Sequence, residues 1–206
     1  MVRTCRFLIA VYLLGGLLSL ANADEKDWDE RSFVGNTRYT FELDNGKEII
    51  KGETSGAASV LYRQERVDLS KRPVVRWRWK IKSTYGADIN EQSREGDDYP
   101  ARVYVVVKTG LFPWQTLAVN YVWSSNGKVG DTWPSAYTKK SHMVAVQAGN
   151  RNAGLWFHER RNVVEDFKRL FDVDVSTLEG YAVMVDGDNT GSSGTAWFSD
   201  IRFDEQ

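Results

Sequence analysis

The chain has 206 residues, with 27 lysines and arginines against 28 aspartates and glutamates, for a formal net charge of −1. A nearly neutral chain has no long-range attraction for nucleic acid or for anionic lipid, so neither partner is expected. Eight tryptophans are more than the core of a domain this size needs, and we expect some of them to be partly exposed as platforms for a sugar or another flat ligand.

Residues 1–23 have the pattern of a signal peptide. Two arginines precede an apolar stretch at Phe7–Leu20, and a small-x-small cleavage pattern ends at Ala23. The apolar stretch is shorter than the roughly 20 residues of a membrane-spanning helix. We therefore expect cleavage after Ala23, a single domain at Asp24–Gln206 with a net charge of about −3, and a periplasmic or secreted location with no membrane span after cleavage.

Cysteine chemistry is absent from the expected mature chain, because the only cysteine, Cys5, lies in the leader. Disulfides, thiolate metal sites and cysteine nucleophiles are thus excluded there. The sequence also lacks the motifs of hydrolase triads, zinc proteases, P-loops and Rossmann folds.

Alternation of apolar and polar residues predicts short β-strands throughout the mature chain. After a loose segment at Asp24–Arg31, the first half is expected to form strands at Thr37–Leu43, Lys47–Gly52, Ala57–Gln64 and Pro73–Ile81. On the last of these, Val75, Trp77, Trp79 and Ile81 share one face, and Arg76, Arg78 and Lys80 share the other.

The second half begins with a polar segment, Ser83–Asp98, whose length indicates a functional loop. Strands are then expected at Ala101–Lys108, Thr116–Ser124, His142–Ala148, Gly154–Arg160, Tyr181–Asp186 and Trp197–Phe203. One amphipathic helix is expected after Asn162, which can cap it with Glu165 three residues on.

About ten short strands and one short amphipathic helix predict an all-β fold, a two-sheet antiparallel β-sandwich that is jelly-roll-like. The helix either covers one end of the sandwich or crosses over between the sheets, and the sequence favours neither.

Acidic residues gather in two turns. Asp186, Asp188 and Asn189 carry oxygen atoms suited to Ca²⁺, although their side chains could equally bond their own backbone. Asp97 and Asp98 form the second pair, which has a solvated loop as its plainer interpretation. If both turns lie at one end of the sandwich, four aspartates converge with Asn189, and two of them could act as the carboxylate pair of a glycosidase.

Basic and amide residues supply further candidate ligand contacts. Arg76, Arg78 and Arg102 need anions, which could be neighbouring acids such as Glu42 and Glu53, or an acidic sugar. The remaining candidates are Asn120 and Trp123 on one expected strand, and Glu159 and Arg160 ahead of the helix. For Asn120 and Arg160 an internal partner is the alternative.

Four segments of the chain, GDDYPARVYVVV, LAVNYVWS, ERRNVVEDFKRLF and VMVDGDNTGSSGTAWFSDIRF, resemble a family of exported bacterial proteins known as domain of unknown function 3047. The resemblance covers roughly Arg76 to Phe203 and implies kinship without an activity. Trp197–Ile201 also resembles the last strand of jelly-roll carbohydrate-binding modules.

The leading hypothesis is a non-catalytic module of the cell envelope that binds a glycan or another small polar ligand through aromatic rings, arginines and aspartates. The alternatives are a carbohydrate-active enzyme with a pair drawn from Asp97, Asp98, Asp186 and Asp188, and a structural or assembly protein of the envelope.

Overall fold

The computed structural model describes residues 27–205, apart from residues 45, 87 and 111–114. The expected leader, its cleavage site and Trp114 lie outside these residues. Within the described part, no helix has the length and apolar character needed to cross a membrane.

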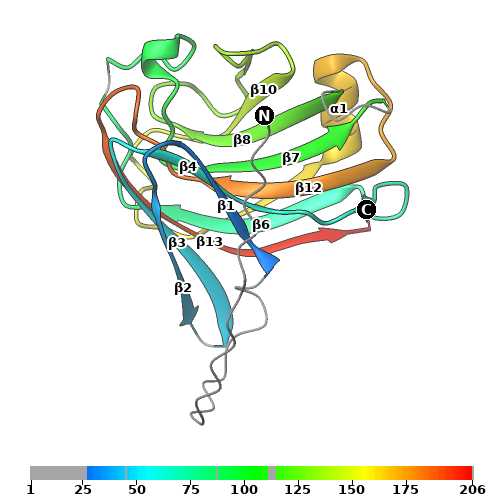
Figure 1. The fold of residues 1–206 in the computed structure, drawn as a ribbon, viewed down its shortest axis with the longest axis horizontal. Coiled ribbons are helices and arrows are strands. Elements are labelled where there is room, and N and C mark those ends of the chain that lie inside the picture. The colour runs from blue at the N-terminus through cyan, green and yellow to red at the C-terminus, as the bar shows by residue number, and fades with distance from the viewer. Residues whose placement is uncertain (1–26, 45, 87, 111–114, 206) are drawn as a thin grey trace, which may run out of the picture.

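Two stacked β-sheets and one α-helix make up the described chain (Figure 1). The larger sheet runs in the order β1 (Asp29–Val34), β4 (Ala58–Arg63), β12 (Thr177–Met184), β7 (Arg102–Lys108), β8 (Thr116–Ser124), β10 (Ser141–Ala148) and β9 (Thr132–Pro134), with β5 (Val67–Asp68) paired to β12. The smaller sheet runs in the order β11 (Phe157–Asn162), β6 (Val74–Ile81), β13 (Ser193–Asp204), β3 (Lys47–Ser55) and β2 (Arg38–Asp44). The predicted two-sheet sandwich is confirmed.

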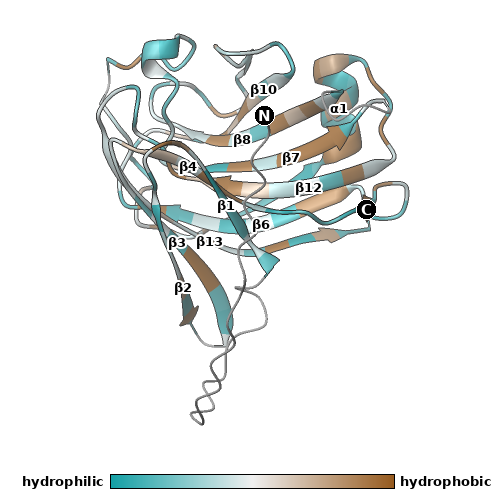
Figure 2. Ribbon diagram, in the orientation of Figure 1, coloured by the Kyte–Doolittle hydropathy of each residue, from teal (hydrophilic) through white to brown (hydrophobic). Residues whose placement is uncertain are grey.

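The core lies between the sheets, where the apolar positions of facing strands meet. Figure 2 shows hydrophobic residues along strands of both sheets. Trp77 stacks on Tyr121 with ring centroids 5.2 Å apart, and Trp79 packs against Trp123 at 5.8 Å. These four rings are at most 1% exposed. Large buried aromatic side chains contribute strongly to stability, so much of the tryptophan content serves packing.

The helix α1 (Val163–Phe171) begins where the sequence predicts. Asn162 accepts a hydrogen bond from the backbone of Glu165 at 3.3 Å and donates one to its side chain at 2.8 Å, which satisfies free groups at the helix start. The helix leads from β11 of the smaller sheet to β12 of the larger sheet. It is therefore a crossover between the sheets.

Three strands and one pairing differ from the expectation. β1, β5 and β9 were not predicted, since β1 is exposed along its whole length and the other two have only two and three residues. β10 pairs with β8 in parallel, whereas the other pairs of the described chain are antiparallel. The segment between β8 and β10 carries β9, so these two strands are not a simple hairpin.

Candidate functional site

A pocket of about 460 Å³ lies on the face of the larger sheet that points away from the core. Val103, Val105 and Val107 of β7 and Val183 of β12 face the core, so the residues that alternate with them face outward. The pocket is lined by Phe33, Val34, Ala58, Asp97, Arg102, Tyr104, Asn120, Ser135, Tyr137, Thr138, Ser141, Met143, Met184, Asp186, Asp188 and Asn189. Six of these were candidates from the sequence: Asp97, Arg102, Asn120, Asp186, Asp188 and Asn189. Asp98 does not line the pocket, but its carboxylate lies within 4.8 Å of those of Asp186 and Asp188.

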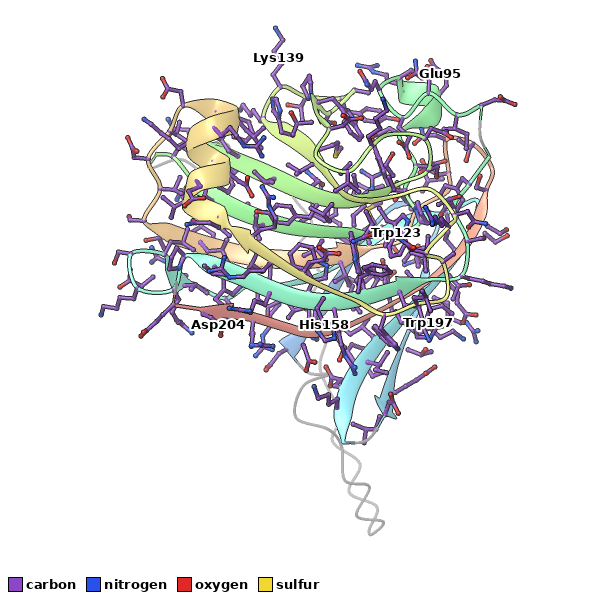
Figure 3. All side chains as sticks on the ribbon, turned by 180° about the vertical axis from the view of Figure 1, so that it is seen from behind. Glu95, Trp123, Lys139, His158, Trp197 and Asp204 are labelled. Atoms are coloured by element: carbon purple, nitrogen blue, oxygen red, sulfur yellow. The ribbon has the colours of Figure 1, made fainter. Side chains whose placement is uncertain are left out.

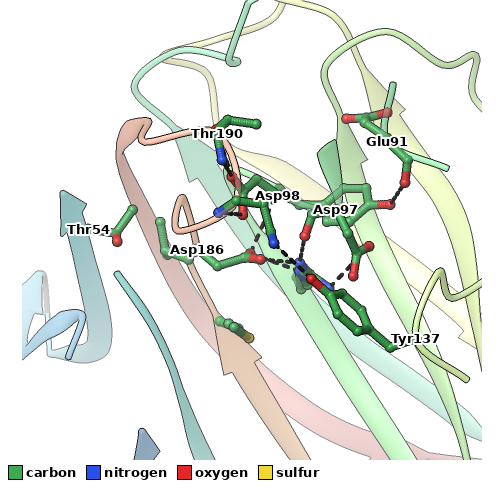
Figure 4. A network of polar contacts seen from close by, with 12 residues as sticks. Thr54, Glu91, Asp97, Asp98, Tyr137, Asp186 and Thr190 are labelled. Atoms are coloured by element: carbon green, nitrogen blue, oxygen red, sulfur yellow. Dashed lines mark hydrogen bonds and ion pairs between the residues drawn. The ribbon is translucent and has the colours of Figure 1, made fainter. Parts of the chain in front are cut away.

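Arg102 and Asp186 form the buried centre of the site (Figure 4). Arg102 lies opposite Met184 in the β7–β12 pair, which brings Asp186, two residues further on, to the same face. The guanidinium binds both carboxylate oxygens, with Nε 2.8 Å from Oδ1, and also donates to the carbonyl of Asp97 at 2.5 Å. Burial raises the pKa of Asp186 to about 7, although Arg102 opposes that shift.

Asp98 ties the two predicted acidic turns together (Figure 4). Its carboxylate accepts hydrogen bonds from the backbone of Asn189 at 3.3 Å and of Thr190 at 2.7 Å, and from the Thr190 hydroxyl at 2.6 Å. The structure thus brings the four aspartates and Asn189 to one place, while their role in binding stays a prediction. The carboxylate of Asp98 serves a turn on another segment rather than its own backbone.

Asp97 and Asp188 are the two acids of the pocket with fewer internal partners. Burial raises the pKa of both carboxyl groups, and the charge of nearby Asp98 adds to each shift. Asp97 is 4% exposed, and its Oδ1 has no hydrogen-bond partner in the described chain, although Nη1 of Arg102 lies 3.9 Å away. Asp188 is half-buried.

A calcium site would require a somewhat different ligand set from the predicted one. Oxygens of Asp98, Asp186 and Asp188 lie within 4.8 Å of one another. The side-chain nitrogen of Asn189, however, donates to the Tyr137 hydroxyl at 2.8 Å. In addition, Arg102 already neutralises part of the charge of Asp186. Calcium binding stays a prediction. It would be supported if CaCl₂ raises the thermal unfolding midpoint of the unmodified protein and does not raise that of Asp188→Asn.

Asn120 lies at the floor of the pocket, in a row with Tyr104 of β7 and Met143 of β10. Its side-chain nitrogen donates to the Ser141 hydroxyl at 2.6 Å. The residue is fully buried, and its Oδ1 has no hydrogen-bond partner within the part of the chain that is described. Buried polar atoms normally have a hydrogen-bond partner, so the lack of one for this amide oxygen needs an explanation.

Tyr104, Tyr137, Met143 and Met184 also line the pocket and were not predicted from the sequence. The Tyr137 ring is 52% exposed at the rim, where its hydroxyl bonds Asn189. Tyr104 and Met184 alternate with core-facing residues, so the strand pattern that singled out Arg102 could have found them. No local pattern marks Tyr137, which reaches the pocket from the segment between β9 and β10.

Trp123 and Glu159 do not reach this pocket. Trp123 is 0% exposed between the sheets, and its indole nitrogen donates to the carbonyl of Gly149 at 3.0 Å. Glu159 accepts hydrogen bonds from Trp79 at 3.1 Å and from Gln147 at 2.8 Å. Both side chains have partners inside the fold, which removes the reason to assign them a ligand.

Arg76, Arg78 and Arg160 lie on strands β6 and β11 of the other sheet. Arg76 pairs with Asp204 at 2.8 Å and Arg78 with Asp200 at 3.3 Å, rather than with the expected glutamates. Arg160 is exposed and has no ion pair among the described residues, whereas its neighbour Arg161 pairs with Asp166 of the helix, with Nε 2.9 Å from Oδ2.

Comparison with solved structures finds glycan-active and glycan-binding proteins of low identity. A cellulase derived from that of Rhodothermus marinus is 9% identical, with 87% of this chain and 97% of that chain covered and a TM-score of 0.48. The carbohydrate-binding module TmCBM27, described as recognising mannan, is 13% identical, with 96% and 99% covered and a TM-score of 0.38. With TM-scores below 0.5, these likenesses do not bear on the function of this chain.

Comparison at the sequence level identifies the family. We found no match among curated proteins. The model of the family described as "Protein of unknown function (DUF3047)" matches residues 26–202, which include the helix, every residue of the pocket and both sheets apart from the last two residues of β13. The chain belongs to this family.

Proposed function

We propose that the protein binds a small neutral glycan in the pocket on the outer face of the larger sheet, without chemical turnover. The observation that carries this proposal is the buried Oδ1 of Asn120, which lacks a hydrogen-bond partner in the described chain while its residue lines the pocket. An unsatisfied buried acceptor costs about 1–3 kcal/mol. A hydroxyl group of a ligand would remove that cost.

The chemistry of the lining supports a neutral sugar. Both unpartnered atoms, Oδ1 of Asn120 and Oδ1 of Asp97, are acceptors, so the ligand should offer donors such as hydroxyl groups. Three aspartates against one arginine line the pocket and disfavour an anionic ligand. The rings of Tyr104 and Tyr137 offer apolar surfaces on which the faces of a pyranose ring can pack.

Binding without turnover is supported by the hydrogen bonds of two of the four aspartates. Asp98 is held by Asn189 and Thr190, and Asp186 by Arg102. Removing a proton from substrate, or donating one to it, would break these contacts.

A carbohydrate-active enzyme is the second candidate, and Asp97 and Asp188 are the observation that favours it. Both line the pocket, and burial raises the pKa of each, as is typical of a general acid. This function would be established if the protein releases new reducing ends from an oligosaccharide, and if Asp97→Asn still binds the oligosaccharide but no longer releases them. That result would contradict binding without turnover.

The test is calorimetric titration with neutral gluco-, manno- and xylo-oligosaccharides. Tyr137→Ala removes an exposed ring at the pocket rim and should weaken binding about tenfold. The control Leu43→Ala, which removes another exposed hydrophobic side chain, near the end of β2, should bind as the unmodified protein does. The proposal fails if no neutral oligosaccharide binds, or if the two variants bind alike.

A further inference from the structure

The smaller sheet carries an excess of positive charge on the side that faces away from the sandwich. Strands β6, β11 and β13 place five cations there against two acids, Asp200 and Asp204. We call this surface the basic face and define it by Arg76, Arg78, Lys80, Arg160, Arg202, Trp156 and Trp197. The whole chain has a net charge of −1, so the charge is unevenly distributed.

Three arginines of the basic face form one row across the strands. Arg76 of β6 lies opposite Arg160 on one side and opposite Arg202 on the other. Asp204 is 2.8 Å from Nε of Arg76 and 3.2 Å from Nε of Arg202, and no other ion pair is found for these three arginines among the described residues. The row therefore holds three guanidinium groups and one carboxylate, which pairs with Arg76 and Arg202 but not with Arg160. Like charges on neighbouring strands repel one another.

Lys80 forms a second row with two tryptophans. Its Nζ lies 4.4 Å from the ring centroid of Trp197 and 5.0 Å from that of Trp156, and the Arg78 guanidinium lies 4.6 Å from Trp156. Within the described chain, no carboxylate lies within ion-pair distance of Lys80. The two indoles are half-buried and hold the ammonium group between them.

We propose that the basic face binds an acidic polysaccharide, at a site separate from the pocket of the larger sheet. Carboxylates along a uronate chain would meet the arginines in the fork geometry that guanidinium groups favour, and the sugar rings would pack on Trp156 and Trp197. Figure 3 shows Trp197, His158 and Asp204 on the side of the smaller sheet that faces away from the larger sheet, with Trp123 between the sheets. The positive charge of this side fits a polyanion. Because the two indoles can pack against sugar rings, they favour an acidic polysaccharide over a polyanion without such rings.

The experiment compares polygalacturonate with its fully methyl-esterified form, which keeps the sugar rings and lacks the charge. The protein should bind the acidic polymer, more weakly at high salt, and should not bind the ester measurably. Lys80→Gln keeps the packed stem and removes the charge, and Trp156→Ala removes one ring. Each should weaken binding about tenfold, whereas the control Lys139→Gln, which changes an exposed lysine between β9 and β10, should have no effect.

Several results would overturn the proposal. These are the absence of polygalacturonate binding, equal binding of the ester, or unchanged binding in both Lys80→Gln and Trp156→Ala. Equal affinity for polyglutamate or duplex DNA would show that charge alone is recognised, and would contradict a sugar-specific site. Tyr137→Ala should leave polygalacturonate binding intact, because it changes only the pocket on the other sheet. Weaker polygalacturonate binding in this variant would contradict the proposal that the two sites are separate.

Discussion

At the scale of single residues, burial governs Asp186 more than its ion pair does. The side chain is 1% exposed, and its pKa rises from an ordinary value of 3.8 to about 7 despite the contact with Arg102. A carboxyl group in this state keeps its proton at mildly acidic pH. The site therefore has fewer negative charges at pH 5 than at pH 8.

This shift predicts how stability depends on pH. Between about pH 4 and pH 7 the folded chain holds the proton of Asp186 while the unfolded chain releases it, so the free energy of unfolding falls as pH rises through this window. Urea unfolding at pH 5 and pH 7.5 measures this, and Asp186→Asn should show a smaller fall. In the control Asp200→Asn the fall should persist, because the pKa of Asp200 lies below its ordinary value. An equal fall in both variants would contradict the assignment.

Gly187 is required by the path of the acidic turn. A Cβ atom there would lie 2.3 Å from the carbonyl oxygen of Ser192, which accepts a hydrogen bond from the backbone N–H of Gly56 at 2.9 Å. Gly187→Ala should therefore lower the free energy of unfolding by about 2 kcal/mol, as measured by urea denaturation. Gly86→Ala is the control, because its Cβ would have an ordinary contact at 3.9 Å. Equal stability of the two variants would contradict this packing.

At the scale of elements, Asp98 fastens the turn after β12 to the segment before β7. Asp98→Ala removes three hydrogen bonds to Asn189 and Thr190, and should cost about 2–3 kcal/mol of stability. Hydrogen exchange at the amides of these two residues should become faster. Asp88→Ala, at an exposed position of the preceding segment, should change neither quantity. Unchanged exchange in Asp98→Ala would show that the turn is held by other contacts.

The strands that the sequence predicts are those whose two faces differ. β6 alternates between buried tryptophans and half-buried cations, and α1 has both a cap and an apolar stripe, so each could be recognised locally. β1 is exposed on both faces and shows no alternation. The parallel pairing of β10 with β8 depends on how the segment between them folds, which local patterns do not determine.

At the scale of the whole molecule, the two sheets present outer faces of opposite character. The larger sheet carries the acidic pocket, and the smaller sheet carries the basic face. From the sequence, Asp97, Asp98, Asp186 and Asp188 were expected to meet only if both acidic turns lay at one end of the sandwich, a condition that local patterns do not determine. Tyr137 joins them only through tertiary structure, and the placement of Trp123 in the core required knowing which face of β8 is buried.

The central claim is that the pocket over β7, β8 and β10 binds a neutral sugar. Hydrogen–deuterium exchange with and without a saturating neutral oligosaccharide from the titration panel tests it most directly. Binding should slow exchange in residues 97–104, 135–143 and 184–190, and leave β6 and β13 unchanged. Protection confined to β6 and β13, or none in the three pocket segments, would contradict the claim.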